Sequence, residues 1–140
     1  MTEEPKELTP TQLDRKYAAM LPENLRNDIG SAFSKILSDD PTIKIPATRS
    51  FMALLQTAFV INGDTRYDSL IKEHTMNSID AVACYASENW AAAIEICYKI
   101  QADLGFLVYC GYGASDGVST SGLLNTSTKQ TQPVAKGGKA

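Results

Sequence analysis

The chain has 140 residues, of which 44% are hydrophobic and 21% are charged, and its formal net charge is −3. This length fits one domain with a substantial core and is too short for two ordinary domains. No apolar run reaches the ~18 residues of a membrane-spanning helix, and the opening MTEEPKELTP has acids and a proline where a secretory signal needs basic and apolar residues. We therefore expect a cytoplasmic protein that makes no contact with a membrane.

The charge is unevenly distributed along the chain. From Gly117 onward there are three lysines, Lys129, Lys136 and Lys139, and no acid, which leaves −6 for residues 1–116. An acidic body does not attract nucleic acid over its general surface. Any contact with phosphate groups therefore needs a local basic cluster or the basic tail.

The first quarter of the chain predicts two amphipathic helices. In LTPTQLDRKYAAML, Thr9 is a suitable N-cap and Pro10 suits the first helical position. A second helix follows Pro22, with apolar residues on one face and charged residues on the other. The apolar faces consist of Leu13, Tyr17 and Met20 in the first helix, and Leu25, Ile29, Phe33, Ile36 and Leu37 in the second.

The segment SDDPTIKIP interrupts this helical pattern. Pro41 and Pro46 disfavour a helix, so we expect a short extended connection here. Thr48 is then the expected N-cap of a third, strongly apolar helix. The sequence Asn62-Gly63-Asp64 is expected to end that helix, because Asn and Gly accept the left-handed conformation found at helix ends.

The second half predicts a short helix over residues 66–74 and a long apolar stripe over residues 78–104. The stripe is either one kinked helix or two helices, with Ser87 as the cap of the second. Trp90 lies on the stripe and is expected to be a buried core residue. Residues 106–110, FLVYC, are too few to be assigned to a strand or a helix by periodicity. The other stripe residues are Ile79, Val82, Ala83, Ala86, Ala93, Ile94, Cys97, Ile100 and Leu104.

These elements predict an all-α protein with a single compact domain of about five helices. Beyond Tyr112 the chain is rich in Gly, Ser and Thr, so too little apolar surface is buried there to offset the entropy of ordering the backbone. We expect a disordered N-terminal arm at residues 1–8, a helical domain at residues 9–114 and a flexible tail at residues 115–140.

The residue types that carry catalysis are poorly placed in this sequence. The only histidine, His74, is expected near the end of a short polar helix, in solvent and without a positioned partner. The glycines of GFLVYCGYGASDG match neither a dinucleotide fingerprint nor a phosphate-binding loop. We therefore expect no cofactor and no enzymatic activity.

Three cysteines, Cys84, Cys97 and Cys110, lie in or beside apolar runs. Their odd number and wide spacing favour buried free thiols over disulfides or a zinc site. Asp39 and Asp40 lack the alternating oxygen ligands of a calcium loop. We expect no bound metal.

Several short motifs resemble, in their order, landmarks of the coat proteins of flexuous filamentous plant viruses. They are KIPA at 44–47, NGDTRY at 62–67, YASENW at 85–90, and SDGV before SGLL. In that family a helical core binds single-stranded RNA and flexible arms link neighbouring subunits. The resemblance implies the same roles here, and a place in a virion.

The chain also departs from that family. Asp64 and Thr65 stand where the family usually has two serines, and Ala83 stands where it usually has a basic residue near the RNA. The chain is shorter than typical members, with less room between Tyr67 and Tyr85. These departures concern the RNA pocket more than the helical core.

The tail has a resemblance of its own. TKQT at 128–131 and GGKA at 137–140 resemble the exposed amino-terminal tail of the third core histone in both motifs and in their separation, whereas the intervening QPVAK does not match. This resemblance implies a lysine-bearing peptide that histone-tail readers would bind. Lys129, Lys136 and Lys139 are the corresponding candidate contacts.

Basic and aromatic residues flank the third expected helix. Lys44, Arg49, Arg66 and Tyr67 would form one patch for single-stranded RNA if the two ends of that helix are neighbours in space. The alternative interpretation is a set of solvated charges without a specific partner.

We expect a structural or interaction protein, namely a self-associating coat or nucleocapsid-like subunit that binds single-stranded RNA. The alternative is a small helical adaptor whose basic C-terminal tail engages a partner protein, such as a histone-tail reader. An undetected hydrolase or transferase is the third interpretation.

Overall fold

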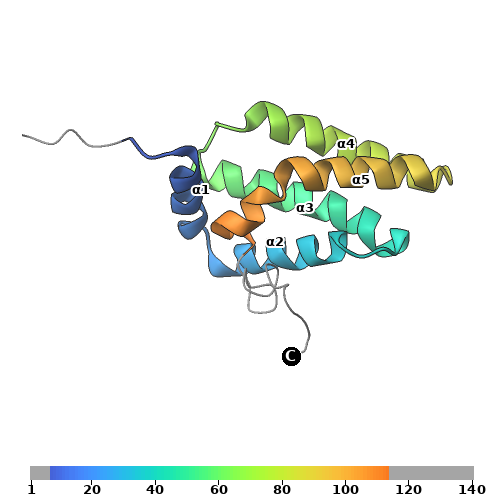
Figure 1. The fold of residues 1–140 in the computed structure, drawn as a ribbon, viewed down its shortest axis with the longest axis horizontal. Coiled ribbons are helices and arrows are strands. Elements are labelled where there is room, and N and C mark those ends of the chain that lie inside the picture. The colour runs from blue at the N-terminus through green and yellow to red at the C-terminus, as the bar shows by residue number, and fades with distance from the viewer. Residues whose placement is uncertain (1–6, 114–140) are drawn as a thin grey trace, which may run out of the picture.

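A computed structural model describes residues 7–113, which form five α-helices and one short π-helical turn (Figure 1). The fold class predicted from the sequence is confirmed for this part of the chain. The tail residues Lys129, Lys136 and Lys139, and the landmarks SDGV and SGLL, lie outside the described residues. The elements are α1 (Pro10–Ala19), α2 (Glu23–Ile36), α3 (Pro41–Asn62), α4 (Asp68–Ala86), α5 (Trp90–Leu104) and η1 (Val108–Tyr112).

Helices α2 to α5 lie alongside one another, and α1 packs at one end of this bundle (Figure 1). Helix α3 is central, because it packs against α2, α4 and α5. Helix α1 instead contacts η1, so the first and last described elements meet. No helix within residues 7–113 is both long enough and apolar enough to span a lipid bilayer.

Local capping signals place several helix ends where the sequence predicts them. The Thr9 hydroxyl accepts a hydrogen bond from the Gln12 amide at 3.1 Å, and the Gln12 side chain accepts one from the Thr9 amide at 2.8 Å. This reciprocal capping box starts α1. Gly63, with φ of 64°, ends α3 in the left-handed conformation.

The prediction of an extended connection at residues 41–46 is wrong, because these residues form the first turns of α3. Asp40 is the N-cap, and its carboxylate accepts a hydrogen bond from the Thr42 amide at 3.0 Å. Pro46 lies near the start of the helix on its exposed side, where its missing N–H removes one helical hydrogen bond. Thr48 is therefore no cap, and its hydroxyl donates instead to the Lys44 carbonyl at 2.8 Å.

Residues 66–74 do not form a separate short helix. They belong largely to α4, which runs without a break through Ser78 to Ala86. The long stripe at residues 78–104 then divides into two helices at Ser87, Glu88 and Asn89. The cap of the second helix is Asn89 rather than Ser87, and Glu88 takes a positive φ of 65° in the turn.

Residues 106–110, which the sequence alone does not assign to a strand or a helix, are helical. Phe106 and Leu107 lead into η1, which contains residues 108–110 and in which Gly111 has a φ of 115°. A side chain at Gly111 would also approach the Cβ atom of Ala18 on α1 to 3.3 Å. Glycine therefore permits both the backbone conformation and the close packing of α1 against η1.

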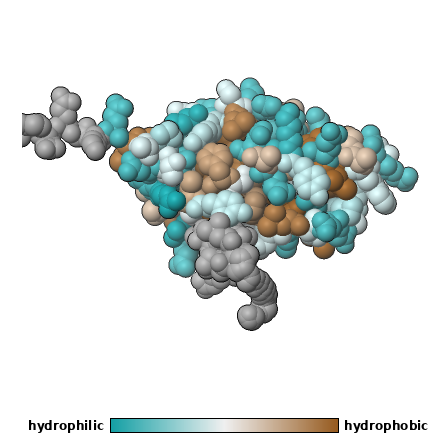
Figure 2. All heavy atoms as spheres, in the orientation of Figure 1, coloured by the Kyte–Doolittle hydropathy of each residue, from teal (hydrophilic) through white to brown (hydrophobic). Residues whose placement is uncertain are grey.

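The apolar stripe is only partly buried. Ala93, Cys97, Ile100 and Leu104 on α5 face the interior, but α4 turns Ile79 and Val82 to solvent. Trp90 is 53% exposed, which contradicts the expectation that it is a core residue. It stands at the start of α5 and stacks on Tyr85, with 6.1 Å between ring centroids. Figure 2 shows that apolar side chains lie among polar ones on one face of the bundle.

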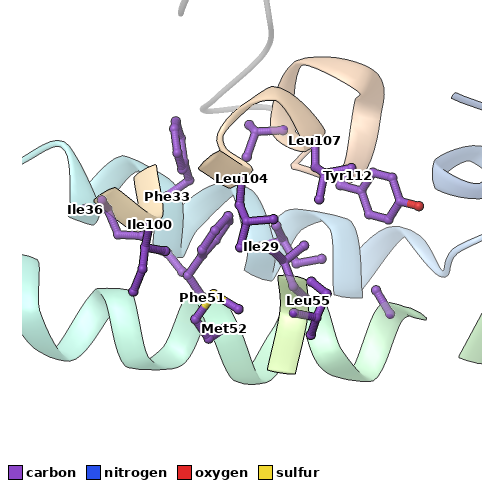
Figure 3. Close-up of a cluster of buried hydrophobic side chains, with 14 of the residues drawn as sticks. Ile29, Phe33, Ile36, Phe51, Met52, Leu55, Ile100, Leu104, Leu107 and Tyr112 are labelled. Carbon is purple, nitrogen blue, oxygen red and sulfur yellow. The ribbon is translucent and has the colours of Figure 1, made fainter. Parts of the chain in front are cut away.

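The core lies where α2, α3, α5 and the residues around η1 meet (Figure 3). Phe33 of α2 and Phe51 of α3 pack with their ring centroids 5.6 Å apart. Leu104, Leu107 and Tyr112 cover this layer from the other side. Each of these side chains is at most 2% exposed, so they supply much of the apolar burial that holds the helices together.

Replacing Trp90 tests this description of burial. Trp90→Ala is expected to lower the free energy of unfolding by about 1 kcal/mol or less, because the ring is half exposed. Phe51→Ala, the matched change in the core, should lower it by about 3–5 kcal/mol. Urea denaturation of both variants measures the difference, and equal losses would show that Trp90 is buried after all.

Candidate functional site

Arg66 joins α1 to the turn between α3 and α4. Its Nε and Nη2 atoms donate to the two carboxylate oxygens of Asp64 at 2.9 and 2.8 Å. Nη2 also lies 2.8 Å from a carboxylate oxygen of Asp14 on α1. The side chains of Asp14 and Asp64 are only 3% and 1% exposed, so two buried carboxylates share one guanidinium.

Aromatic rings surround this ion pair. The Tyr67 hydroxyl donates to Asp14 at 3.0 Å, and the rings of Tyr17 and Tyr67 lie 5.2 and 4.9 Å from the guanidinium carbon of Arg66. Phe59 packs edge-on against Tyr67 and stacks on Tyr112. The guanidinium is therefore held by charge, by hydrogen bonds and by cation–π contacts together.

The pKa shifts follow from this geometry. Burial alone would raise the pKa of Asp64, but the hydrogen bonds and charge of Arg66 outweigh it and leave that pKa lowered. The hydrogen bond to Asp64 raises the pKa of Arg66. Burial, followed by the hydrogen bond to Asp14, raises the pKa of Tyr67 to about 12.

The structure does not bring the four predicted RNA contacts together. Lys44 and Arg66 lie near opposite ends of the single helix α3, whose residues from 44 to 62 span about 27 Å at 1.5 Å per residue. Arg66 and Tyr67 are already engaged by Asp14 and Asp64. A single basic and aromatic patch is therefore not formed.

Lys44 has a structural role in this fold. It is 2% exposed, its Nζ atom donates to the carbonyl of Ile36 at the end of α2, and it lies 4.4 Å from the ring centroid of Tyr98. Burial lowers the pKa of Lys44. It therefore caps a helix end and offers no exposed charge to a phosphate group.

Arg49 is the remaining member of the predicted patch. It is partly exposed, and it forms no ion pair with another residue in the described range 7–113. Helical spacing places Arg49 on the same side of α3 as Gln56 and Val60, which line a groove against α4. Arg49 is thus the candidate that remains available to a partner.

That groove lies between the end of α3 and the start of α4. It has a volume of about 620 Å³, and Val60 and Met76 at its sides are 74% and 55% exposed. Apolar side chains continue along α4 beyond it, with Ile79 at 42% and Val82 at 39% exposure. The lining includes Gln56, Phe59, Val60, Ile71, Thr75 and Met76.

The expectation that His74 is exposed to solvent is wrong. His74 is fully buried between α4 and α5, with Nε2 2.8 Å from an Asp103 carboxylate oxygen and Nδ1 3.1 Å from the Asn77 amide nitrogen. The ring donates to the carboxylate and accepts from the amide. Both ring nitrogens are occupied, so neither is free to act as a general base in this arrangement.

The cysteines are free thiols, as predicted, but they are not all buried as expected. Cys97 is buried, whereas Cys84 and Cys110 are half-buried. Burial raises the pKa of the Cys97 and Cys110 thiols, which lowers their reactivity. Across residues 7–113, no three His, Cys, Asp or Glu side chains are grouped so that they could hold a metal ion.

No protein-family model, curated protein or solved structure matches this chain. The geometry of the described residues therefore carries the functional argument.

Sequence reasoning missed the two buried polar clusters. Asp14 lies within the predicted first helix beside the apolar face of Leu13 and Tyr17, which is a signal of a buried acid, but nothing local identifies Arg66 as its partner. The partner of His74 is Asp103, which is also far from it in sequence and lies on another helix. Only the packing of the helices brings these pairs together.

Removing the charge of Arg66 should destabilise the fold strongly. Arg66→Gln leaves Asp14 and Asp64 buried without their counter-charge, and we expect a loss of about 3–5 kcal/mol in the free energy of unfolding. Arg15→Gln, at an exposed position on the same helix as Asp14, should change it by less than about 0.5 kcal/mol. Urea titrations measure both, and a small loss for Arg66→Gln would contradict a structural role for the ion pair.

Tyr67 should make the protein sensitive to alkali. Its pKa is raised from 10.0 to about 12, so its contribution to stability is complete below about pH 10 and is lost as pH rises through about 12. Tyr67→Phe should therefore flatten the fall in stability between these values. Denaturation midpoints at about pH 9 and pH 11 provide the comparison, and an unchanged slope would show that Tyr67 is ionised equally easily in the folded and unfolded chains.

Proposed function

We propose that this chain is a structural subunit that self-associates through the outer side of α4 and binds single-stranded RNA. The observation that carries the proposal is the orientation of α4. Its buried residues are Ile71, His74, Ser78 and Ala81, whereas Met76, Ile79 and Val82 face solvent. A helix that places polar side chains inward and large apolar ones outward lacks part of its packing in a single copy.

Three of the exposed apolar residues lie close together on α4. Met76, Ile79 and Val82 follow one another at helical spacing, and Met76 lines the same groove as the exposed Val60. Contiguous apolar surface with a polar surround is typical of protein-binding sites. Self-association is the simplest way to cover it, because every copy carries the same surface.

RNA binding rests on fewer residues. Arg49 has no partner among residues 7–113, and Lys129, Lys136 and Lys139 add positive charge to the tail. The resemblance to coat proteins of flexuous filamentous plant viruses supports RNA as the ligand. The acidic body confines any phosphate contact to these few sites.

Sedimentation velocity at rising protein concentration tests self-association. We expect the parent chain to form larger species, and Ile79→Glu to shift it toward the monomer while the thermal unfolding curve is retained, because a charge at this site opposes burial in a contact. Leu37→Glu, at an apolar site that directly follows α2 and is 41% exposed, serves as the control and should leave association unchanged. A parent chain that stays monomeric at all concentrations would remove the basis of the proposal.

Titration of the parent chain with single-stranded RNA at low and high salt tests the proposed RNA binding. Arg49→Ala should weaken binding and reduce the salt slope by about one, since one phosphate contact is lost. Arg15→Ala, which removes the same charge from α1, is the control and should leave binding largely unchanged. If the intact chain fails to bind RNA at about 50 mM salt, where phosphate contacts are strong, the adaptor with a protein-binding tail replaces the RNA-binding subunit.

A further inference from the structure

We propose that two copies of this chain pair through α4 in an antiparallel contact with Met76 at a two-fold axis. The inference rests on the proposed self-association and specifies its surface and its partner, a second copy of the same chain. It is carried by the order of side chains along the exposed face of α4.

Five residues define that exposed face. Ser69, Lys72, Met76, Asp80 and Ala83 recur at intervals of three or four, so they form one stripe, and each is exposed in the structure. Glu73 and Ile79 flank the stripe and are exposed as well. The stripe carries a base on one side of Met76 and an acid on the other.

This order is self-complementary about Met76. In an antiparallel pair with Met76 on the axis, a residue four positions before it faces the residue four positions after it in the other copy. Lys72 then faces Asp80 of the second copy, and the two-fold symmetry makes this contact twice. Ser69 faces Ala83 by the same rule, so small side chains that cause no clash lie at both ends of the contact.

The two charges are available for such a contact. Lys72 and Asp80 form no ion pair within residues 7–113. They are eight residues apart on one helix, about 12 Å along its axis, which is too far for them to pair with each other. A parallel pairing in register would place Lys72 against Lys72 and Asp80 against Asp80, and this repulsion selects the antiparallel arrangement.

Apolar contacts complete the pairing. Met76, 55% exposed, would meet its own copy at the axis, and its flexible side chain adapts to a shared site. Ile79, 42% exposed, would lie against the aliphatic part of Glu73 in the second copy. One helix pair covers less than the roughly 1,600 Å² of a standard interface, so the contact is expected to be weak and dependent on concentration.

Charge reversal tests the pairing directly. Lys72→Glu and Asp80→Lys should each weaken dimerisation about tenfold or more, because each change places like charges together twice in the dimer. The double variant Lys72→Glu/Asp80→Lys restores opposite charges and should regain dimerisation near the parent level. Lys99→Glu, at an exposed lysine on α5, is the control and should dimerise like the parent chain. Circular dichroism and thermal unfolding confirm that each variant is folded.

A covalent test fixes the register. Met76→Cys should give a cross-linked dimer under mild oxidation or with a short thiol-reactive linker, since the two positions meet at the axis. The parent chain, with its three free cysteines, shows the background.

The outcomes separate this inference from the function on which it rests. If the parent chain associates but neither charge reversal affects it, α4 pairing is wrong while self-association stands. If single reversals weaken association and the double variant fails to recover, the antiparallel register about Met76 is wrong. If the parent chain never associates, both the pairing and the proposed function fail.

Discussion

Two buried carboxylates share one guanidinium, and the position of α1 depends on that arrangement. Asp14 can be taken from water only because Arg66 and Tyr67 meet it, and Arg66 is in turn fixed by Asp64 in the turn after α3. Apart from Asp14, only Ala18 of α1 is fully buried, so apolar packing alone specifies the site of this helix poorly. The charged contact selects where α1 lies, and the aromatic residues around it close the end of the bundle.

Local signals predicted the parts of the fold that local interactions determine. The capping box of Thr9 and the left-handed Gly63 involve neighbours in sequence, so both helix ends could be found from the residues alone. The start of α3 could not, because burial of Ile45 and Ala47 outweighs the effect of Pro46. The candidate site is non-local as well, so the sequence predicts Arg66 as an RNA contact although its partner in the fold is Asp14.

The exposed side of α4 shows a second limit of sequence reasoning. Periodicity identifies an apolar stripe but does not say whether the stripe faces the domain interior or another copy. On α5 the stripe is buried under α3, whereas on α4 small and polar residues such as Ser78 and Ala81 face inward. An inward face of small residues lets α4 lie close to its neighbours and leaves larger residues for an external partner. The inner face of α4 thus packs in the folded monomer, whereas its outer face is available for the proposed contact between copies.

The contact between α1 and η1 also orders events during synthesis. Helix α1 is the first described element to leave the ribosome, yet it packs against η1, which is made last. Translation of the intervening residues takes about 5–20 s at typical rates of 5–20 residues per second. Until η1 is made, α1 lacks one of the elements against which it packs. Helix α1 is therefore expected to join the nascent bundle late, and shortening the chain before Tyr112 would remove contacts at both ends of the described range 7–113.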